Sequence, residues 1–420
     1  MNMRQFLFFL LSAVFAFATA LAQTDNQLDA DDETAGLTDT IAADTVGAEA
    51  ALPWPQNVRA GLDGLLNARM FETSQVGLMV FDLTADSVIY QKNERQLMRP
   101  ASTMKLLTAI AAIDRLGGSY LLRTSLSYTG QIENRTLTGD VYCVGGFDPR
   151  FNTDDMKAFV ESLRSMGVDT IRGRIVADKS MKEPEQFGEG WCWDDDNPVL
   201  SPLLVSRKDR FVERFVDELR EAGVVVEAYN SEGEAPQDAS VVCTRSHTID
   251  QILMRMMKES DNLYAEAMFF QLAAASGNTP AKAAHARSAV KKLLGKAGLD
   301  PAMCRIADGS GLSLYNYVSA EIEAKLLRYA YKNSNIYLHL YPSLPIAGED
   351  GTLKKRMKGT HAEGNVRAKT GTLTGVYSLA GYCTASNGHV LCFAILNQGV
   401  LHAGNARVFQ DKVCSLLCRP

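Results

Sequence analysis

The sequence predicts an α/β protein of the α+β sandwich kind: an antiparallel sheet flanked by helices, with a smaller domain inserted between its two halves. The predicted elements run in the order strands, helix, mixed segment, helices, hairpin and last helix, which is typical of this layered arrangement. The 420 residues are 46% apolar and 22% charged. Such a chain can bury a sizeable core and is neither disordered nor fibrous.

The first half of the sandwich is predicted to begin near Pro53. Runs of apolar and β-branched residues predict strands over 76–83 and 86–91, joined by a short turn. Pro100 then opens a helix over 101–116, which has apolar residues at helical spacing and two glycines at its end.

The inserted domain is predicted over residues 119–244, where short strands alternate with amphipathic helices at 154–166 and 208–222. The second half of the sandwich follows it. Its predicted elements are a helix over 253–275 that is broken at 259–261, helices over 280–297 and 319–332, strands over 376–385 and 389–397 around an Asn-Gly turn, and a last helix over 405–417.

The N-terminus is typical of an exported protein. Residues 1–22 combine a basic start, an apolar run and the small-x-small site Ala20-Leu21-Ala22, so we expect a signal peptide that is cleaved after Ala22. The apolar run is short for a stable membrane span. Residues 23–50 hold eight acidic residues and no basic one, which predicts an acidic, solvated linker.

Charge and cysteine spacing argue against several classes of ligand. The net charge of −6 leaves no basic footprint, so we expect no nucleic-acid partner. The cysteines and histidines follow no metal-binding pattern, so neither a metal nor a cofactor is expected. Cys383 and Cys392 flank the predicted hairpin: a two-residue turn would place them near enough for a disulfide, whereas a three-residue loop with a bulge would leave them as free thiols on opposite faces.

Ser102 and Lys105 form a first candidate catalytic pair, Ser-x-x-Lys, in the first turn of the predicted helix. Residues i and i+3 share one helix face, so the ammonium lies beside the hydroxyl. A serine hydroxyl is a weak nucleophile that needs an adjacent base, and a lysine can serve when burial and positive neighbours lower its pKa.

Two further short motifs follow. Ser260-Asp261-Asn262, at the predicted helix break, offers a hydroxyl for proton relay and an amide for a substrate carbonyl, although Ser260 alone would equally serve as a helix N-cap. Lys369-Thr370-Gly371-Thr372 leads into the predicted hairpin. Gly371 lets a ligand approach the backbone closely, and the lysine and two hydroxyls suit a carboxylate.

The three motifs occur in the order found in penicillin-binding proteins and class A β-lactamases. The chain resembles the D-alanyl-D-alanine carboxypeptidase/endopeptidase family, the class C low-molecular-mass penicillin-binding proteins of the penicillin-binding protein 4 kind, and this resemblance implies their transpeptidase-like fold. It covers most of residues 53–420. The segments that carry it are Met98–Ala109, Asp308–Ser313, Leu344–Gly348, Gly351–Leu353, Arg367–Val376 and Leu379–Tyr382.

The resemblance implies the catalytic roles. Ser102 would attack the carbonyl of the penultimate D-alanine in a peptidoglycan stem peptide, with Lys105 as its base. Ser260, together with Lys369, would return the proton to the leaving D-alanine. The backbone N–H groups of Ser102 and Thr372 would form the oxyanion hole. A β-lactam would acylate the same serine.

The resemblance also implies binding residues. Lys369, Thr370 and Thr372 would hold the terminal carboxylate beside Gly371, and Asn262 would bind the stem-peptide backbone.

Two departures from the family concern its inserted modules and its pocket rim. The gap between Ser102 and Ser260 is shorter than usual and has room for one module. The segment Trp191–Asp195 resembles the family's first module, so Asp195 is the candidate partner for the amino group of the stem peptide's diamino acid. Leu314 stands where the family commonly has an arginine, which bears on recognition of a diaminopimelate carboxylate.

The leading interpretation is a periplasmic serine-type D-alanyl-D-alanine carboxypeptidase, with or without endopeptidase activity. One alternative is a β-lactamase, against which stands the lack of a Glu-x-x-Leu-Asn motif between residues 262 and 369. The other is a non-hydrolytic wall-binding or penicillin-sensing module on the same fold. The predicted domains are a signal peptide (1–22), a linker (23–50), a first catalytic segment (51–118), the inserted domain (119–244) and a second catalytic segment (245–420).

Overall fold

The computed structural model of the protein describes residues 52–419, which fall within one compact unit. The predicted signal peptide (1–22) and acidic linker (23–50) lie outside the described residues. Over the described range, no helix has the length and apolar character that a membrane crossing requires.

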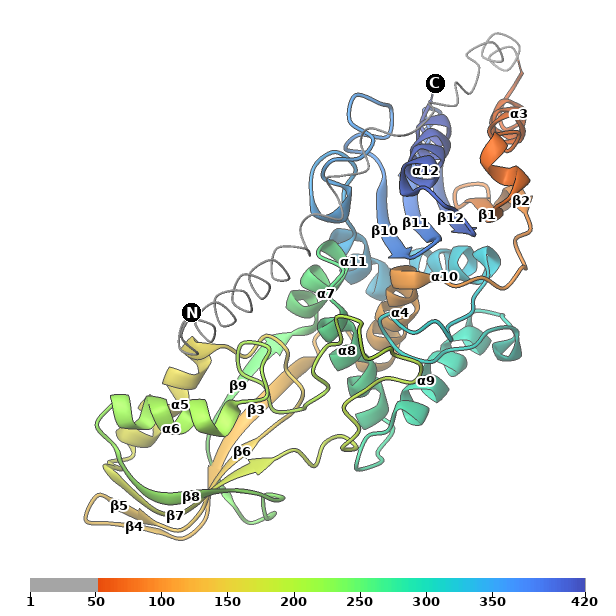
Figure 1. Ribbon diagram of the computed structural model, residues 1–420. Helices are drawn as coiled ribbons and strands as arrows, with labels where there is room; N and C mark the ends of the chain where they lie inside the picture. Colours follow the sequence, from red (N-terminus) through yellow and green to blue (C-terminus); the bar gives the residue numbers. More distant parts are fainter. Residues whose placement is uncertain (1–51, 420) are drawn as a thin grey trace, which may run out of the picture. The chain divides into compact units, whose positions relative to one another are not determined.

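A five-stranded antiparallel sheet joins the two ends of this range (Figure 1). Its strands are β1 (Gln75–Asp82), β2 (Ser87–Lys92), β10 (Arg367–Leu373), β11 (Val376–Thr384) and β12 (Val390–Gln398), in the order β10-β11-β12-β1-β2. Strands from the first and last parts of the chain meet where Leu78 of β1 lies opposite Ile395 of β12. This pairing confirms the predicted antiparallel sheet built from two separated halves.

Helices cover both faces of the sheet (Figure 1). On one face lie α3 (Gln56–Leu65) and α12 (Ala403–Leu417); on the other lies α10 (Ala320–Lys332), backed by α4 (Met104–Leu116), α7 (Ile249–Lys258), α8 (Asn262–Ala274), α9 (Ala283–Lys296) and α11 (Ser334–Ser343). Side chains of β1 alternate between two cores, with Leu78 and Val80 in one and Met79 and Phe81 in the other. That period of two is what a strand buried on both faces requires.

A second, seven-stranded sheet lies between the two halves in the sequence. Its strands are β3 (Leu121–Tyr128), β4 (Gln131–Glu133), β5 (Thr136–Thr138), β6 (Val141–Val144), β7 (Thr170–Asp178), β8 (Val225–Glu232) and β9 (Ser240–Thr248). Helices α5 (Thr153–Ser165) and α6 (Phe211–Glu221) pack on it and share a separate apolar core with it. The domain boundaries stated above remain a prediction.

The break between α7 and α8 differs in one respect from the sequence-based expectation. Ser260 is not the cap of the second helix. Asp261 is the N-cap instead, and its carboxylate accepts a hydrogen bond from Leu263 N at 3.1 Å. Helix α11 is not indicated by the sequence patterns, because Pro342 lies in its last turn and proline usually ends a helix.

The hairpin register decides between the two arrangements of Cys383 and Cys392. Cys383 lies opposite Leu391 and Cys392 lies opposite Tyr382, so the two cysteines point to opposite faces of the sheet. They belong to separate cores, and both are free thiols. The disulfide alternative is therefore wrong, because the loop carries one residue more than a two-residue turn.

Candidate active site

Ser102 lies in η4 (Ala101–Thr103), a short 3₁₀ turn that leads directly into α4. The sequence predicts a continuous helix here, but the α-helix begins only at Met104. Ala101 has a φ of +49°, a left-handed conformation that is costly for a residue with a Cβ. Its carbonyl lies so close to Gly311 that a Cβ there would come within 1.8 Å of Ala101 O. The strained turn is thus held by the neighbouring loop Asp308–Ser313, which contains Gly311.

Lys105 projects from the first turn of α4 into this site and is fully buried. Its Nζ lies 2.9 Å from Ser102 Oγ, 2.7 Å from Asn262 Oδ1 and 2.8 Å from Ser310 O. Burial lowers the pKa of Lys105 to about 8, while nearby carboxylates, Asp308 foremost, act in the opposite direction. Near neutral pH a fraction of this amine is therefore unprotonated and able to accept the serine proton.

Ser260 and Lys369 form a second hydroxyl–amine pair. Ser260, between α7 and α8, has a φ of +58°, and its Oγ lies 2.8 Å from Lys369 Nζ. Lys369 is fully buried on β10 and also donates to Thr370 O at 2.8 Å. Burial, reinforced by the positive charge of Lys105, holds the pKa of Lys369 well below its ordinary value.

Strand β10 is the edge strand beside the nucleophile turn. Alternate residues of such a strand bond to the neighbouring strand or point to the open edge. Ala368 N points to the open edge, where it donates to Pro345 O at 3.0 Å. Thr370 and Thr372 belong to the same alternate set, so their N–H and C=O groups also point to the open edge.

The backbone of β10 touches the nucleophile turn at Gly371. A Cβ there would lie 2.6 Å from Pro100 O and 3.1 Å from Ser102 N, so only glycine allows this approach. Ser102 N–H donates to no other described residue. The N–H groups of Ser102 and Thr372 are therefore both available to an incoming carbonyl oxygen.

Polar side chains line the approach to these groups. Thr370 Oγ1 lies 2.8 Å from Thr352 Oγ1, and Thr372 is exposed. Asn262 accepts from Lys105 through its oxygen, and its Nδ2 has no partner among the described residues. The amide oxygen of Asn262 thus positions Lys105, and its Nδ2 group is left for a ligand.

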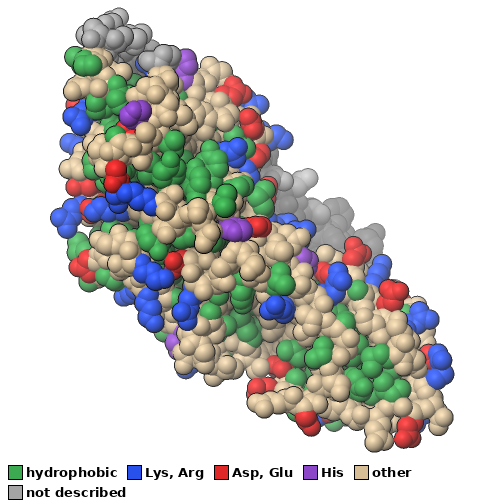
Figure 2. All heavy atoms as spheres, turned by 180° about the vertical axis from the view of Figure 1, so that it is seen from behind, with side chains coloured by type: hydrophobic (Ala, Val, Ile, Leu, Met, Phe, Trp, Pro, Cys, Tyr) green, Lys and Arg blue, Asp and Glu red, His purple; other side chains and the backbone are tan. Residues whose placement is uncertain are grey.

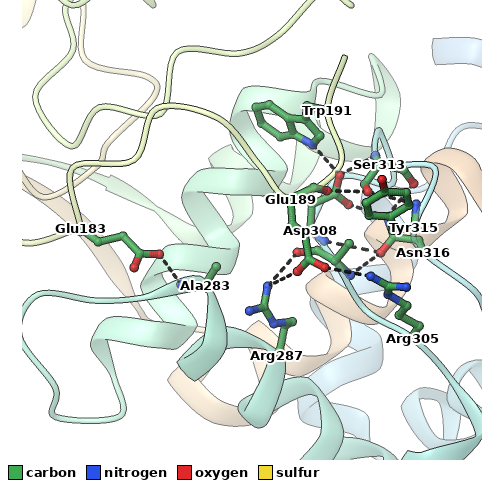
Figure 3. Close-up of polar contacts among 12 residues, drawn as sticks. Glu183, Glu189, Trp191, Ala283, Arg287, Arg305, Asp308, Ser313, Tyr315 and Asn316 are labelled. Atoms are coloured by element: carbon green, nitrogen blue, oxygen red, sulfur yellow. Dashed lines mark hydrogen bonds and ion pairs between the residues drawn. The ribbon is translucent and has the colours of Figure 1, made fainter. Parts of the chain in front are cut away.

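Asp195 is not brought into contact with these motifs. Its Oδ2 accepts a hydrogen bond from Cys192 N at 2.8 Å and so caps its own turn. The same segment reaches the site through Trp191, whose Nε1 donates to Asp308 Oδ2 at 2.8 Å (Figure 3). Leu314, at the rim, is 38% exposed, and its carbonyl accepts from Arg99 Nε at 3.1 Å.

Sequence reasoning missed two buried carboxyl groups behind the site. Glu266, one turn after Asn262 on α8, accepts from Gly309 N at 3.1 Å and Ser310 N at 2.8 Å. Burial raises the pKa of Glu266 to about 8. Glu323 on α10 lies 2.5 Å from Thr103 Oγ1. Glu266 could have been noticed in the sequence, because it is an acidic residue inside an otherwise apolar stretch of helix.

Family comparison agrees with this geometry. The D-Ala-D-Ala carboxypeptidase 3 (S13) family model matches residues 58–205 and 205–418, so the chain belongs to that family and is a serine peptidase. Its relatives include the D-alanyl-D-alanine carboxypeptidase of Actinomadura sp. (strain R39), 28% identical over 83% of this chain and 82% of that protein. The D-alanyl-D-alanine carboxypeptidase DacB of Haemophilus influenzae is 26% identical over 78% and 86%.

Solved structures show the same fold. Penicillin binding protein 4 (dacB) from Haemophilus influenzae superposes with a TM-score of 0.77 at 24% identity, over 84% of this chain and 97% of that one. The same protein in complex with a β-lactam gives a TM-score of 0.70 at 26% identity, over 84% and 98%. The resemblance and the fold class inferred from the sequence are thereby confirmed.

Proposed function

We propose that this serine peptidase is a D-alanyl-D-alanine carboxypeptidase that trims peptidoglycan stem peptides through an acyl-enzyme on Ser102. One observation carries the proposal: the fully buried Lys105 amine lies 2.9 Å from Ser102 Oγ, beside two unpaired backbone N–H groups. A nucleophile, its base and an oxyanion site within one cluster are what acyl transfer requires.

Acylation begins when Lys105 takes the proton of Ser102. Ser102 Oγ attacks the carbonyl of the penultimate D-alanine, and the negative charge that develops on its oxygen is stabilised by the N–H groups of Ser102 and Thr372. Removing one donor of such a pair typically costs about 10²–10³ in rate. Ser260, held 2.8 Å from Lys369 Nζ, delivers a proton to the leaving nitrogen and is resupplied with the proton that Lys105 took from Ser102, so D-alanine departs and Lys105 is an unprotonated amine again.

Deacylation repeats the sequence with water as nucleophile. A water molecule gives one proton to Lys105 and attacks the acyl carbonyl; as the bond to Ser102 Oγ breaks, Lys105 returns that proton to Ser102, which frees the shortened peptide and restores both groups. Release of D-alanine from a stem pentapeptide corresponds to carboxypeptidase activity, and the same steps on a crosslinked peptide give endopeptidase activity.

Recognition of the substrate falls to the edge of β10 and to Asn262. Thr370, Thr372 and Lys369 are the proposed partners of the terminal carboxylate, since the two threonines supply hydroxyl donors on β10 and the Lys369 amine reaches Thr370 O on the same strand. The free Nδ2 of Asn262 suits a peptide carbonyl. Asp195 is the proposed partner for the amino group of the diamino acid, which requires its turn to face the bound peptide.

We expect a β-lactam to acylate Ser102 and to remain attached. The opened ring occupies the space that a hydrolytic water needs, and no glutamate motif of the class A β-lactamase kind lies between residues 262 and 369. Intact-protein mass spectrometry after a penicillin pulse measures the lifetime of the adduct. Rapid return to the unmodified mass would favour the β-lactamase alternative.

The site of action is proposed to be the periplasm, where stem peptides are exposed, because the first 22 residues have the pattern of a cleaved signal. N-terminal sequencing of the exported protein tests this proposal. A mature chain that starts at Gln23 supports it, and an uncleaved Met1 in the purified protein contradicts it.

Ser102→Ala is the decisive substitution. It should abolish both D-alanine release and covalent penicillin labelling, because no other hydroxyl can replace the nucleophile. Ser288→Ala is a matched control, since Ser288 and Lys291 repeat the Ser-x-x-Lys spacing on the exposed face of α9. Undiminished labelling of Ser102→Ala would overturn the proposal, whereas labelling without any peptide turnover in the native chain would favour a penicillin-sensing module.

A further inference from the structure

A long connection without regular secondary structure links β7 to α6. We call this segment, Lys179–Arg210, the strap. Its two ends join elements of the second sheet's layer, but from its third residue on it contacts the catalytic part of the chain, where Met181 O accepts from Ala281 N at 2.8 Å. Long ordered loops of this kind are usually functional, because ordering them costs entropy that only specific contacts offset.

The first half of the strap is fixed to the glycine loop Asp308–Ser313 (Figure 3). Glu189 pairs with Arg287 at 3.1 Å and with Arg305 at 3.0 Å, and its carbonyl accepts from Ser313 Oγ at 2.6 Å. Trp191 Nε1 donates to Asp308 Oδ2 at 2.8 Å.

Asp308, the first residue of that glycine loop, holds the loop together through its side chain. It is buried, and its carboxylate accepts from Gly311 N and Ser313 N at 2.8 and 2.7 Å. The loop in turn supplies Ser310 O, which lies 2.8 Å from Lys105 Nζ. Trp191 is therefore linked to the proposed base, Lys105, by a chain of contacts: Trp191 bonds to Asp308, Asp308 holds the loop, and the loop carbonyl of Ser310 contacts Lys105.

The second half of the strap reaches the other wall of the site. Arg207 Nη1 donates to Asp261 Oδ2, which also accepts from Arg255 Nε at 2.8 Å. The Asp261 side chain is 5% exposed, and both guanidinium groups lie over the ring of Tyr264, at 6.0 and 5.3 Å from its centroid. The middle residue of the Ser260-Asp261-Asn262 motif is thus held from two different segments.

Backbone conformation explains why this turn needs such anchoring. Ser260 has a φ of +58°, and Arg207 has a φ of +70°. Non-glycine residues persist in that region only when their surroundings fix them. Asp261 is flanked by Ser260, which contacts Lys369, and by Asn262, which contacts Lys105. If Asp261 is displaced, Ser260 and Asn262 move with it, and Lys369 and Lys105 each have one hydrogen-bond partner displaced.

We propose that the strap is a positioning element of the active site, with Trp191 acting through Asp308 and Arg207 acting through Asp261. Neither residue touches the reacting atoms. The inference rests on the proposed roles of Ser102, Lys105 and Ser260, and it adds that the inserted segment, rather than the catalytic layers alone, sets their geometry.

Arg207→Met is the first test, with Arg174→Met as its matched control. Arg174 also forms one ion pair, with Asp140, and its side chain is 44% exposed, as is that of Arg207. We expect Arg207→Met to slow penicillin acylation about 10- to 100-fold, because small displacements of catalytic groups have effects of this size. Arg207→Lys should recover part of the rate, and Arg174→Met should match the native enzyme.

A double-mutant comparison shows through which residue Arg207 acts. If the contact with Asp261 carries the effect, then Arg207→Met should add little to Asp261→Asn. With a D-alanyl-D-alanine peptide, kcat should fall while KM changes little. Additive losses, or an Arg207→Met rate equal to that of Arg174→Met, would overturn the proposal.

Trp191→Phe tests the other contact without emptying its site. An aromatic ring stays, while the N–H donor to Asp308 is lost together with the smaller ring of the indole; Trp193→Phe makes the same exchange at a side chain that is 91% exposed on the same strap. Slower acylation in Trp191→Phe alone supports the proposal, and equal rates in the two variants contradict it. All strap variants should still reach full labelling, which distinguishes a failure of this inference from a failure of Ser102 as nucleophile.

Discussion

Lys105 has to lose its proton before it can act as a base. Its pKa of about 8 lies below the ordinary value of a lysine because the side chain is fully buried. The unprotonated fraction grows as the pH rises towards 8, so we expect the rate of penicillin acylation to increase through this range and to level off above it. Lys105→Arg should lose about 10²–10⁴ in rate at every pH, since an arginine stays protonated.

Stopped-flow acylation with a fluorescent penicillin between pH 6 and 9 measures this profile. Arg174→Met, whose ion pair is remote from the motifs, should show the same rise as the native enzyme. A profile that is flat or falls with pH would mean that Lys105 is not the base.

Glu323 is a buried acid without a cationic partner. The Thr103 hydroxyl has one proton but two acceptors within reach, Pro100 O at 2.8 Å and Glu323 Oε1 at 2.5 Å. A proton on Glu323 satisfies both contacts, because the acid then donates to Thr103, which donates to Pro100. Burial raises the pKa of Glu323 to about 8, and among the described residues no charged side chain faces it.

Stability should therefore depend on pH through Glu323. The folded state keeps a proton that the unfolded chain releases above its ordinary pKa of 4.5, so this contribution is complete below pH 4.5 and is lost as the pH rises towards 8. Glu323→Gln mimics the neutral acid. Between pH 5.5 and 7.5 we expect the unfolding free energy of Glu323→Gln to rise relative to that of the native protein by roughly 2–3 kcal/mol.

Urea unfolding of the two proteins at both pH values tests this difference. Glu266, the other buried acid with a raised pKa, is present in both and cancels from the comparison. A difference that does not change with pH would show that Glu323 is ionised in the folded protein.

At the scale of elements, the site depends on how closely β10 approaches η4. Gly371→Ala would introduce a methyl group at 2.6 Å from Pro100 O, so one of the two backbones must move. We expect a loss of stability of about 1–3 kcal/mol and a loss of acylation of at least about tenfold, because overpacking displaces the strand edge from Ser102.

Gly295→Ala serves as the control for this substitution. Gly295 lies within α9, is exposed, and has nothing within 4 Å of the added methyl group. The variant should be unchanged or more stable, since alanine favours a helix by about 0.5–1 kcal/mol over glycine. Penicillin labelling rates and thermal melting of both variants give the comparison. Normal acylation by Gly371→Ala would mean that the strand edge tolerates displacement.

Local sequence patterns predicted the regular elements well and their special conformations poorly. The helical spacing over 154–166 and 319–332 matches α5 and α10 within a residue or two, because one buried face fixes each period. The 3₁₀ start at Ala101 and the left-handed Ser260 depend on packing against Gly311 and on the Asp261 anchors. Such long-range contacts leave no signal in local sequence.

The same limit applies to the site. Ser102, Lys105, Ser260 and Lys369 lie in short motifs, so their pairing followed from the sequence. Arg207 gave no such signal, because its partner Asp261 lies far along the chain and only the folded strap brings them together.

For the whole molecule, surface charge and cysteine burial bear on where it acts. Acidic and basic side chains are interspersed over the face shown in Figure 2, in line with the absence of a basic footprint in the sequence.

All eight cysteines lie in the described part of the chain and are free thiols. Cys192 is exposed, Cys243 is half-buried, and the others are buried. A protein exported to an oxidising compartment would keep such thiols reduced only by excluding oxidants from them.

Thiol titration of the purified protein tests this protection. Under native conditions we expect Cys192 to react first and Cys243 more slowly, while the buried thiols stay silent, because burial raises the pKa of Cys143, Cys392 and Cys414 and so suppresses their thiolates. Cys192→Ser should remove the fast phase alone. After unfolding without reductant, all eight thiols should react. A smaller number would show that a disulfide forms in the compartment where the protein matures.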